Sequence, residues 1–262
     1  MFLKAAILGL VEGLTEFLPV SSTGHLILAG GLLRFTGEKA STFEIFIQLG
    51  AILAVVVFFR RKFAGLFNWS STQGFSGKRG IALLACTTAP ALAVGFLTHH
   101  FIKEHLFNPF TVAIGLGIGG LWILASEKWP RHFAKSGLDS LGGREALGVG
   151  FFQCLALWPG FSRSAATILG GMTLGLDRKT ATEYSFFAAV PVMAAACLLD
   201  LIKSRHALSA ADLPLFAVGF IVAFFSAWAS IQFLLGFVSR HKLNGFGWYR
   251  LVLALAVFLF LR

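Results

Sequence analysis

The sequence predicts an all-α polytopic membrane protein with six transmembrane helices plus two re-entrant helical hairpins, arranged as an inverted repeat. Of its 262 residues, 56% are hydrophobic and only 13% are charged, and the mean hydropathy is +0.79. A soluble fold of this size cannot bury so many apolar side chains. Two patterns within the chain, long apolar runs and interrupted apolar runs, divide it into spanning helices and hairpins.

The six expected spans are apolar runs that mostly approach the roughly 20 residues a helix needs to cross the hydrocarbon. Two further apolar regions are broken near the middle by Pro and by Ser or Thr, which leaves halves of about 12 to 17 residues that are too short to span. Such halves are typical of re-entrant hairpins, whose broken backbone must line a cavity. The expected spans cover residues 43–59, 81–98, 110–126, 182–202, 213–237 and 246–261, and the hairpins cover 1–35 and 146–176.

A weak internal similarity relates the two hairpins. A shift of 140 residues places Pro19 on Pro159 and Ser22 on Ser162. Each half then consists of a hairpin and three spans. Because three is odd, the second half would enter the membrane upside down, and the two hairpin tips would meet near the midplane. The predicted repeats, which form one integral membrane domain, cover residues 1–131 and 132–262.

Charge predicts the orientation and the partners. The net charge is +10, and the basic residues lie in short loops between spans. Anionic lipid head groups and the positive-inside bias explain this charge better than nucleic acid does, so we expect membrane lipids and no nucleic acid as partners. The loops on the expected cytoplasmic side are richer in Lys and Arg, which places both termini outside. These loops lie near residues 60–79, 127–145, 177–181 and 237–246.

Two acidic residues in the first apolar stretch predict a functional site. Glu12 and Glu16 are one helical turn apart and share a face, so both carboxylates can point at one cation. Ionisable groups at membrane depth are costly and by default mark a substrate or ion site. The alternative is that Arg163 or Arg34 holds one of them in a structural ion pair. Gly9 and Gly13 have the same spacing and predict close packing of a neighbouring helix.

The first break follows at Pro19, where Ser21, Ser22 and Thr23 can supply an N-cap to the next half-helix. Capping alone would explain these residues. A helix N-terminus inside the membrane also offers free amide groups and a positive dipole end, which favour a phosphate. His25 can reach the same pocket, although a lone His in an apolar segment is usually a core residue.

The second break, Trp158-Pro-Gly-Phe-Ser-Arg-Ser164, repeats this pattern. Ser162 and Ser164 can cap the following half-helix. Arg163 is the difference, because a guanidinium at this position matches phosphate oxygens bidentately. Thr167 lies one turn further along the same face.

The glycine-rich segment at residues 115–120 formally fits a dinucleotide-binding pattern, but it lies within a span with no preceding strand. It predicts a small-residue packing face instead. Gln48 and Glu183 are polar residues within spans, and we expect them to support the site.

The two breaks resemble a known family. Glu12-Gly-Leu-Thr-Glu16 followed by PVSSTGH is similar to the [E/Q]-x-x-x-E signature of the bacitracin-resistance type undecaprenyl-diphosphate phosphatases, and PGFSRSAAT at 159–167 is similar to their P-G-x-S-R-S-x-x-T signature. The resemblance extends over the whole chain. It implies hydrolysis of undecaprenyl diphosphate to the monophosphate lipid carrier of cell-wall synthesis. It also implies a bacterial inner-membrane location, a site facing the periplasm, and a divalent cation, Mg²⁺ or Ca²⁺.

Carried onto this sequence, the resemblance implies site roles for residues in both breaks. Together with the chemistry of a diphosphate, it predicts that Glu12 and Glu16 bind the metal and that Arg163 and the half-helix N-termini hold the diphosphate. Ser22 is the expected nucleophile with His25 as its base, and a metal-activated water is the alternative. The expected catalytic residues are Glu16, Ser22, His25 and Arg163, and the expected substrate-binding residues are Ser21, Thr23, Ser162, Ser164 and Thr167.

A transporter is the competing class. Inverted repeats and broken helices are also the architecture of secondary transporters, so a carrier or flippase for a polyprenyl phosphate would share these features. Phosphate release in detergent, where no transport can occur, distinguishes the two. The expected lipid partner of the enzyme is a polyprenyl diphosphate substrate, and a homodimer is left open.

Overall fold

The structure is a computed structural model that describes residues 1–70, 73–128, 134–203 and 210–260, and its regular structure within these ranges is helical. An isolated bridge pairs Lys135 with Leu176. The predicted all-α class is therefore confirmed. The boundary between the two predicted repeats, at residues 131 and 132, lies outside the described ranges.

The helices follow the order that the sequence predicts. The first half holds α1 (Phe2–Glu16), α2 (Ser22–Leu33), α3 (Glu38–Phe58), α4 (Arg60–Leu66), α5 (Gly77–Phe101), η1 (Ile102–Leu106) and α6 (Pro109–Ser126). The second half holds η2 (Leu138–Ser140), α7 (Gly143–Gln153), η3 (Cys154–Leu157), α8 (Arg163–Thr173), α9 (Arg178–Lys203), η5 (Ala210–Asp212), α10 (Leu213–Val238) and α11 (Asn244–Phe260).

Five of the described helices, α3, α5, α6, α9 and α10, are long and apolar enough to cross a membrane. The sixth expected span corresponds to α11, which has 17 residues. Large apolar side chains on the outer faces are exposed, such as Phe96 and Leu97 on α5 and Phe225 on α10. Contiguous exposure of this kind is expected where lipid replaces water. The chain is a polytopic membrane protein.

One short helix was not expected. The sequence analysis placed residues 60–79 in a loop, but Arg60–Leu66 forms α4. The reason is local packing, because Leu66 is buried and Phe63 packs against the main apolar cluster. Arg60, Arg61 and Lys62 lower the average hydropathy of this segment, so hydropathy alone does not predict that Phe63 and Leu66 pack inside the molecule.

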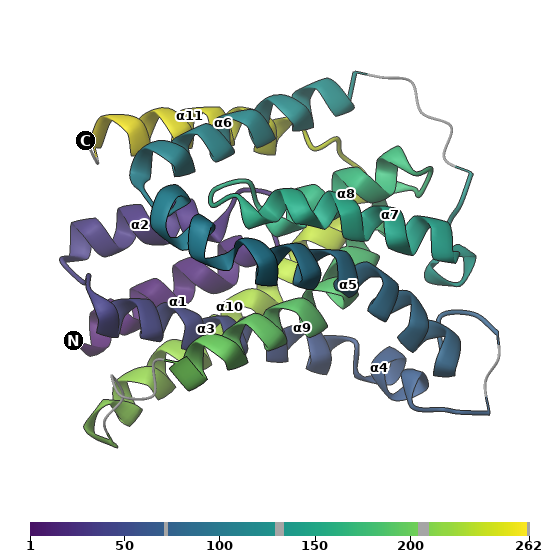
Figure 1. The fold of residues 1–262 in the computed structure, drawn as a ribbon, viewed down its shortest axis with the longest axis horizontal. Coiled ribbons are helices and arrows are strands. Elements are labelled where there is room, and N and C mark those ends of the chain that lie inside the picture. Colours follow the sequence, from purple (N-terminus) through teal and green to yellow (C-terminus); the bar gives the residue numbers. More distant parts are fainter. Residues whose placement is uncertain (71–72, 129–133, 204–209, 261–262) are drawn as a thin grey trace.

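The two hairpins lie in opposite halves of the molecule. Figure 1 shows α1 and α2 on the left and α7 and α8 on the right, with both chain termini at the left end. The long helices run between the two ends and surround the hairpins. The breaks within the two hairpins meet, since the Ser164 hydroxyl donates to the Leu18 carbonyl. The inverted repeat stays a prediction.

Small residues fix α1 against α10. A Cβ added at Gly9 would overlap the backbone of Gly219, and one added at Gly13 would overlap Ser226. The Ser230 hydroxyl donates to the Leu14 carbonyl at 2.9 Å and ties the two helices further along. The predicted packing role of Gly9 and Gly13 is confirmed, and it holds the carboxyl end of α1, where Glu16 lies, in a fixed place.

Candidate active site

The first break begins where α1 ends at Glu16 and ends where α2 begins at Ser22. Ser21 is the N-cap of α2, with a φ of 70°, and its side chain makes no cap hydrogen bond. A positive φ in a non-glycine residue is uncommon, and strained backbone of this kind clusters at functional sites. The turn brings the start of α2 back towards Glu16.

The second break uses the same backbone device. Ser162, the N-cap of α8, has a φ of 77°, and its hydroxyl accepts the Ala165 amide at 3.2 Å. The two N-caps, Ser21 and Ser162, are 141 positions apart rather than the 140 of the sequence shift, because the second break has one more residue between its proline and its N-cap. The first helical residues, Ser22 and Arg163, therefore correspond.

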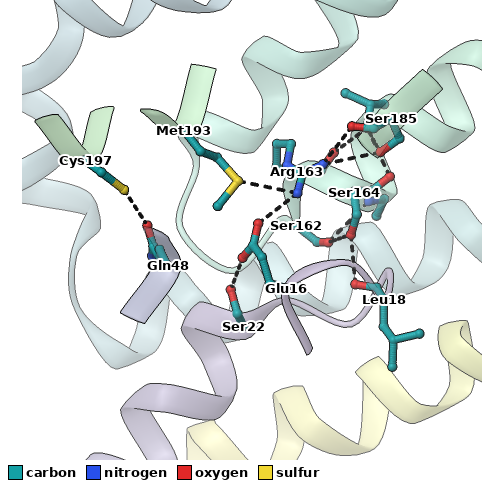
Figure 2. A network of polar contacts seen from close by, with 12 residues as sticks. Glu16, Leu18, Ser22, Gln48, Ser162, Arg163, Ser164, Ser185, Met193 and Cys197 are labelled. Atoms are coloured by element: carbon teal, nitrogen blue, oxygen red, sulfur yellow. Dashed lines mark hydrogen bonds and ion pairs between the residues drawn. The ribbon is translucent and has the colours of Figure 1, made fainter. Parts of the chain in front are cut away.

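Glu16 joins these two helix starts. The Ser22 hydroxyl donates to Glu16 Oε2 at 2.7 Å, and Arg163 Nη2 donates to Glu16 Oε1 at 2.9 Å (Figure 2). Both members of the ion pair are nearly buried, with side-chain exposures of 12% for Arg163 and 8% for Glu16. The ion pair that the sequence analysis raised as an alternative for one glutamate is present, but it lies within the expected site.

Arg163 is further held by α9. Its Nη1 donates to the Ser185 carbonyl at 3.1 Å, and the Ser185 and Thr167 hydroxyls lie 2.6 Å apart. The guanidinium also lies over the Phe17 ring, 5.6 Å from its centroid. Arg163 Nε is buried and has no hydrogen-bond partner among the described residues. One donor thus remains available at the site.

The two breaks also contact each other directly. The Ser164 hydroxyl donates to the Leu18 carbonyl at 2.8 Å and lies 3.0 Å from the Ser162 hydroxyl. Figure 2 shows this contact beside the Glu16 cluster. Ser164 therefore links the hairpins.

A cavity of about 160 Å³ lies between the breaks. Six of the expected site residues line it, and Gln48, which was expected to support the site, lies on its wall as well. Glu12, His25, Ser164 and Thr167 are not among the lining residues. The lining consists of Glu16, Ser21, Ser22, Thr23, Gln48, Ala156, Trp158, Pro159, Gly160, Ser162, Arg163 and Met193.

His25 does not contact Ser22 in this structure. Its Nδ1 lies 2.7 Å from the Ser21 carbonyl and its Nε2 lies 2.7 Å from the Tyr249 hydroxyl. Its ring also stacks on the Tyr249 ring. The side chain within hydrogen-bond distance of the Ser22 hydroxyl is Glu16, so the expected pairing of Ser22 with His25 differs from the observed geometry.

Glu12 lies one turn before Glu16 and is fully buried, and neither of its carboxylate oxygens has a hydrogen-bond partner in the described part of the chain. Such a pair of oxygens fits a hard divalent cation, which takes oxygen ligands. Within the described ranges, no group of three or more His, Cys, Asp or Glu side chains could hold a metal. A cation would therefore need phosphate or water oxygens beside the two carboxylates.

Glu183 does not support the site. Its carboxylate pairs with Lys62 at 2.9 Å and lines a separate cavity with Asp139 and Asp177. Glu183 lies close to the start of α9, whereas Ser185, only two residues later, contacts Arg163. Hydropathy alone could not distinguish these two polar positions.

The glycine-rich segment of α6 packs as predicted. A Cβ added at Gly115 would lie 2.5 Å from the Pro159 carbonyl, and one added at Gly119 would overlap the guanidinium of Arg250. The second break can approach α6 only because these positions lack side chains. Ser185, Tyr249 and Arg250 belong to no motif in the sequence and were not predicted as site residues.

The fold and the site define an integral membrane protein with a buried carboxylate, hydroxyl and guanidinium cluster between two half-helix N-termini, an arrangement suited to a phosphate group. The chain belongs to the family described as bacitracin resistance protein BacA, whose model matches residues 5–256.

Curated relatives cover almost the whole chain. A protein of Maridesulfovibrio salexigens named undecaprenyl-diphosphatase is 57% identical over 98% of this chain and 97% of its own length. Proteins of the same name from Oleidesulfovibrio alaskensis and Lawsonia intracellularis are 57% and 52% identical, over 98% and 97% of this chain and 98% and 96% of their own lengths.

Proposed function

We propose that the protein is an undecaprenyl-diphosphate phosphatase, which releases inorganic phosphate from undecaprenyl diphosphate and returns the monophosphate carrier to cell-wall synthesis. The proposal rests on the hydrogen bonds that Glu16 accepts from Ser22 and Arg163, which lie at the N-termini of two half-helices. The names of relatives more than 50% identical to this chain support it.

The diphosphate would bind where positive partial charges converge. The first amide groups of α2 and α8 have no intrahelical acceptor and carry the positive ends of the helix dipoles. Arg163 adds a full charge and an Nε–H that has no hydrogen-bond partner among the described residues. Ser21, Thr23 and Ser162 on the cavity wall supply further polar groups. Together these groups can neutralise the charge of a transferring phosphoryl group.

Ser22 is the nucleophile in the proposed reaction, and Glu16 takes its proton. As the Ser22 oxygen attacks the terminal phosphorus, the bond from that phosphorus to the bridging oxygen breaks, and undecaprenyl phosphate leaves. Water then hydrolyses the phosphoserine and releases inorganic phosphate. Glu16 replaces His25 as the base because its carboxylate lies 2.7 Å from the Ser22 hydroxyl. His25 instead holds the first break against Tyr249.

A divalent cation, Mg²⁺ or Ca²⁺, is proposed to bind at Glu12 and Glu16. When bound, it would neutralise phosphate charge or activate a water, which remains the alternative nucleophile. The oxygens of Glu12, which have no hydrogen-bond partner in the ranges that the structure describes, support this placement. If it is correct, Mg²⁺ raises the melting temperature of the wild type, and this rise is lost in Glu12→Gln. An equal rise in both proteins contradicts the placement.

The site is proposed to face the periplasm of a bacterial inner membrane. Both termini lie at the left end in Figure 1, and the ends of α3 and α5 that flank the basic segment containing α4 lie on the right. The positive-inside bias would make the right end cytoplasmic. Labelling of an introduced cysteine at position 2 by an impermeant reagent in intact cells tests this orientation.

The test of the function is phosphate release from undecaprenyl diphosphate by the purified, detergent-solubilised protein, with and without EDTA. Release that disappears with chelator, in Glu16→Ala and in Arg163→Ala supports the proposal. Glu38→Ala and Arg60→Ala are matched controls, because both residues are exposed and neither lines the cavity. No release from folded wild-type protein would contradict it and favour a transporter of polyprenyl phosphate.

A further inference from the structure

Arg250 of α11 is a buried charge that the proposed mechanism does not use. Its relative exposure is 0%, and it forms no ion pair with a carboxylate among the described residues. A buried charge without a counter-ion is costly, and at membrane depth it usually marks a functional site. Its partners show what it does.

The guanidinium of Arg250 binds backbone carbonyls of both breaks. Its Nη1 donates to the Pro19 carbonyl at 3.2 Å, in the first break. Its Nη2 donates to the carbonyls of Gly160 at 2.9 Å and Phe161 at 2.8 Å, in the second break. One planar group therefore bridges the two segments that lead into the N-caps. Pro19 lies two residues before Ser21, and Phe161 lies directly before Ser162.

A third segment, α6, fixes the guanidinium itself. Arg250 Nε donates to the Leu116 carbonyl at 3.2 Å, and Nη2 also reaches the Gly115 carbonyl at 3.1 Å. Gly119 leaves the space that the guanidinium occupies, since a Cβ there would overlap it. The group is thus anchored to a spanning helix and cannot follow either break if that break moves.

We propose that Arg250 is a positioning residue of the active site, whose guanidinium holds the two breaks in one fixed relation and so keeps Ser22 and Arg163 at Glu16. The kinetic side of this inference rests on the proposed phosphatase function. Pro19 lies three residues before Ser22, and Phe161 lies two residues before Arg163, so a shift of either carbonyl is passed on to a reacting group. A misplacement of about 1 Å can cost on the order of 100-fold in rate.

Three variants test the proposal. Arg250→Met removes the donors, and Arg250→Lys keeps the charge but loses the planar fork. Gly119→Ala keeps Arg250 and displaces its guanidinium. Arg79→Lys is the matched control, because Arg79 also binds backbone carbonyls, those of Gly74 and Leu141, but lies away from the breaks.

We expect kcat of phosphate release to fall about 100-fold in Arg250→Met and about 10-fold in Arg250→Lys and Gly119→Ala, with KM within about threefold of wild type. Arg79→Lys should lower the melting temperature and leave kcat unchanged. Hydrogen–deuterium exchange should accelerate at residues 17–21 and 158–162 in the Arg250 and Gly119 variants, and not in Arg79→Lys.

Several outcomes would overturn the inference. A folded Arg250→Lys protein with the kcat of the wild type would show that charge alone suffices. A raised KM with unchanged kcat, or unchanged exchange at both breaks, would also overturn it. If Arg250→Met does not fold, the two milder variants decide. If the wild type releases no phosphate, the proposed function fails, and the exchange data alone judge whether Arg250 holds the breaks.

Discussion

The two breaks share a backbone and differ in their chemistry. Each turns into its second half-helix through a serine with positive φ, 70° at Ser21 and 77° at Ser162. At the next position, the first break carries Ser22 and the second carries Arg163. Both of these side chains reach Glu16, one at each carboxylate oxygen.

The same backbone turn, a serine N-cap with a positive φ, therefore places two different side chains at one carboxylate. Ser22 and Arg163 both contact Glu16. A hydroxyl can act as a nucleophile and a guanidinium can neutralise phosphate charge, and neither group can replace the other. The strained N-caps cost on the order of 1–3 kcal/mol each. Their presence in both breaks fits a site at which the side chains of the first helical residues, Ser22 and Arg163, must be held in a defined orientation.

The largest expected effect comes from the second break. Arg163→Ala should lower phosphate release by about 1,000-fold, because it removes the charge that neutralises the transferring phosphoryl group. Arg163→Lys keeps a charge without the fork and should recover only part of the rate. Steady-state phosphate release in detergent measures both.

A fully active Arg163→Lys protein would contradict the idea that the guanidinium contributes geometry as well as charge. The exposed Arg60 on α4 provides the control, since Arg60→Ala changes the net charge by the same amount away from the cavity.

The corresponding change in the first break is Ser22→Ala. We expect the rate to fall by about 100-fold or more, because the nucleophile is lost while Arg163 and the helix N-termini remain. Ser41→Ala is the control, since Ser41 is exposed and bonds only its own helix. Near-normal turnover of Ser22→Ala would exclude the covalent route and favour attack by water.

The N-caps themselves should respond differently to the loss of their hydroxyls. Ser162→Ala removes the hydrogen bond to the Ala165 amide and should cost about 1 kcal/mol of stability. Ser21→Ala should cost less, because the Ser21 side chain makes no cap bond. Thermal unfolding in detergent compares them. Equal losses would mean that the two caps are not as different as their geometry indicates.

A smaller effect lies outside both breaks, at Glu127, just beyond the end of α6. Burial alone would raise the pKa of Glu127, but hydrogen bonds from Arg178 and the Leu243 amide outweigh it and hold the pKa below its ordinary value of 4.5. Because the folded pKa is lowered, the stabilisation is present above pH 4.5 and is lost as the pH falls through the folded pKa.

The melting temperature of Glu127→Gln should therefore lie below that of the wild type at neutral pH, and the gap should narrow in acid. The kcat of the folded variant should be unchanged. A gap that stays constant from about pH 7 down to about pH 3 would show that the ionised carboxylate is not what stabilises this end of the molecule.

The sequence predicted the helical class, the long helices and both breaks, because apolar length and interruptions by proline and serine are local signals. It also predicted that Glu16, Ser22 and Arg163 share a site. The partner of the Ser22 hydroxyl was not predictable from the spacing. His25 lies three positions from Ser22 along the chain and Glu16 lies six, yet the turn at Ser21 places Glu16 within hydrogen-bond distance of Ser22.

Residues that act from distant helices were missed for a related reason. Ser185, Tyr249 and Arg250 lie in apolar spans without a motif, and their contacts span 18 to 231 positions along the chain. In a hydropathy profile such a residue is only a polar position within an apolar span, and the profile does not show which residue it contacts. Its role depends on which helix lies opposite, and this is set by packing at positions such as Gly9 and Gly119.

The small size of the cavity has a consequence for what the protein can distinguish. A space of about 160 Å³ is well below the roughly 300–1,000 Å³ of pockets that enclose a drug-sized ligand, so it has room for a phosphate head and not for a long prenyl tail. The tail of a lipid substrate would stay in the bilayer. Such a site contacts the phosphate head group and does not contact most of the hydrocarbon tail. Substrates with shorter tails should therefore differ in how they partition into the membrane more than in how fast they react.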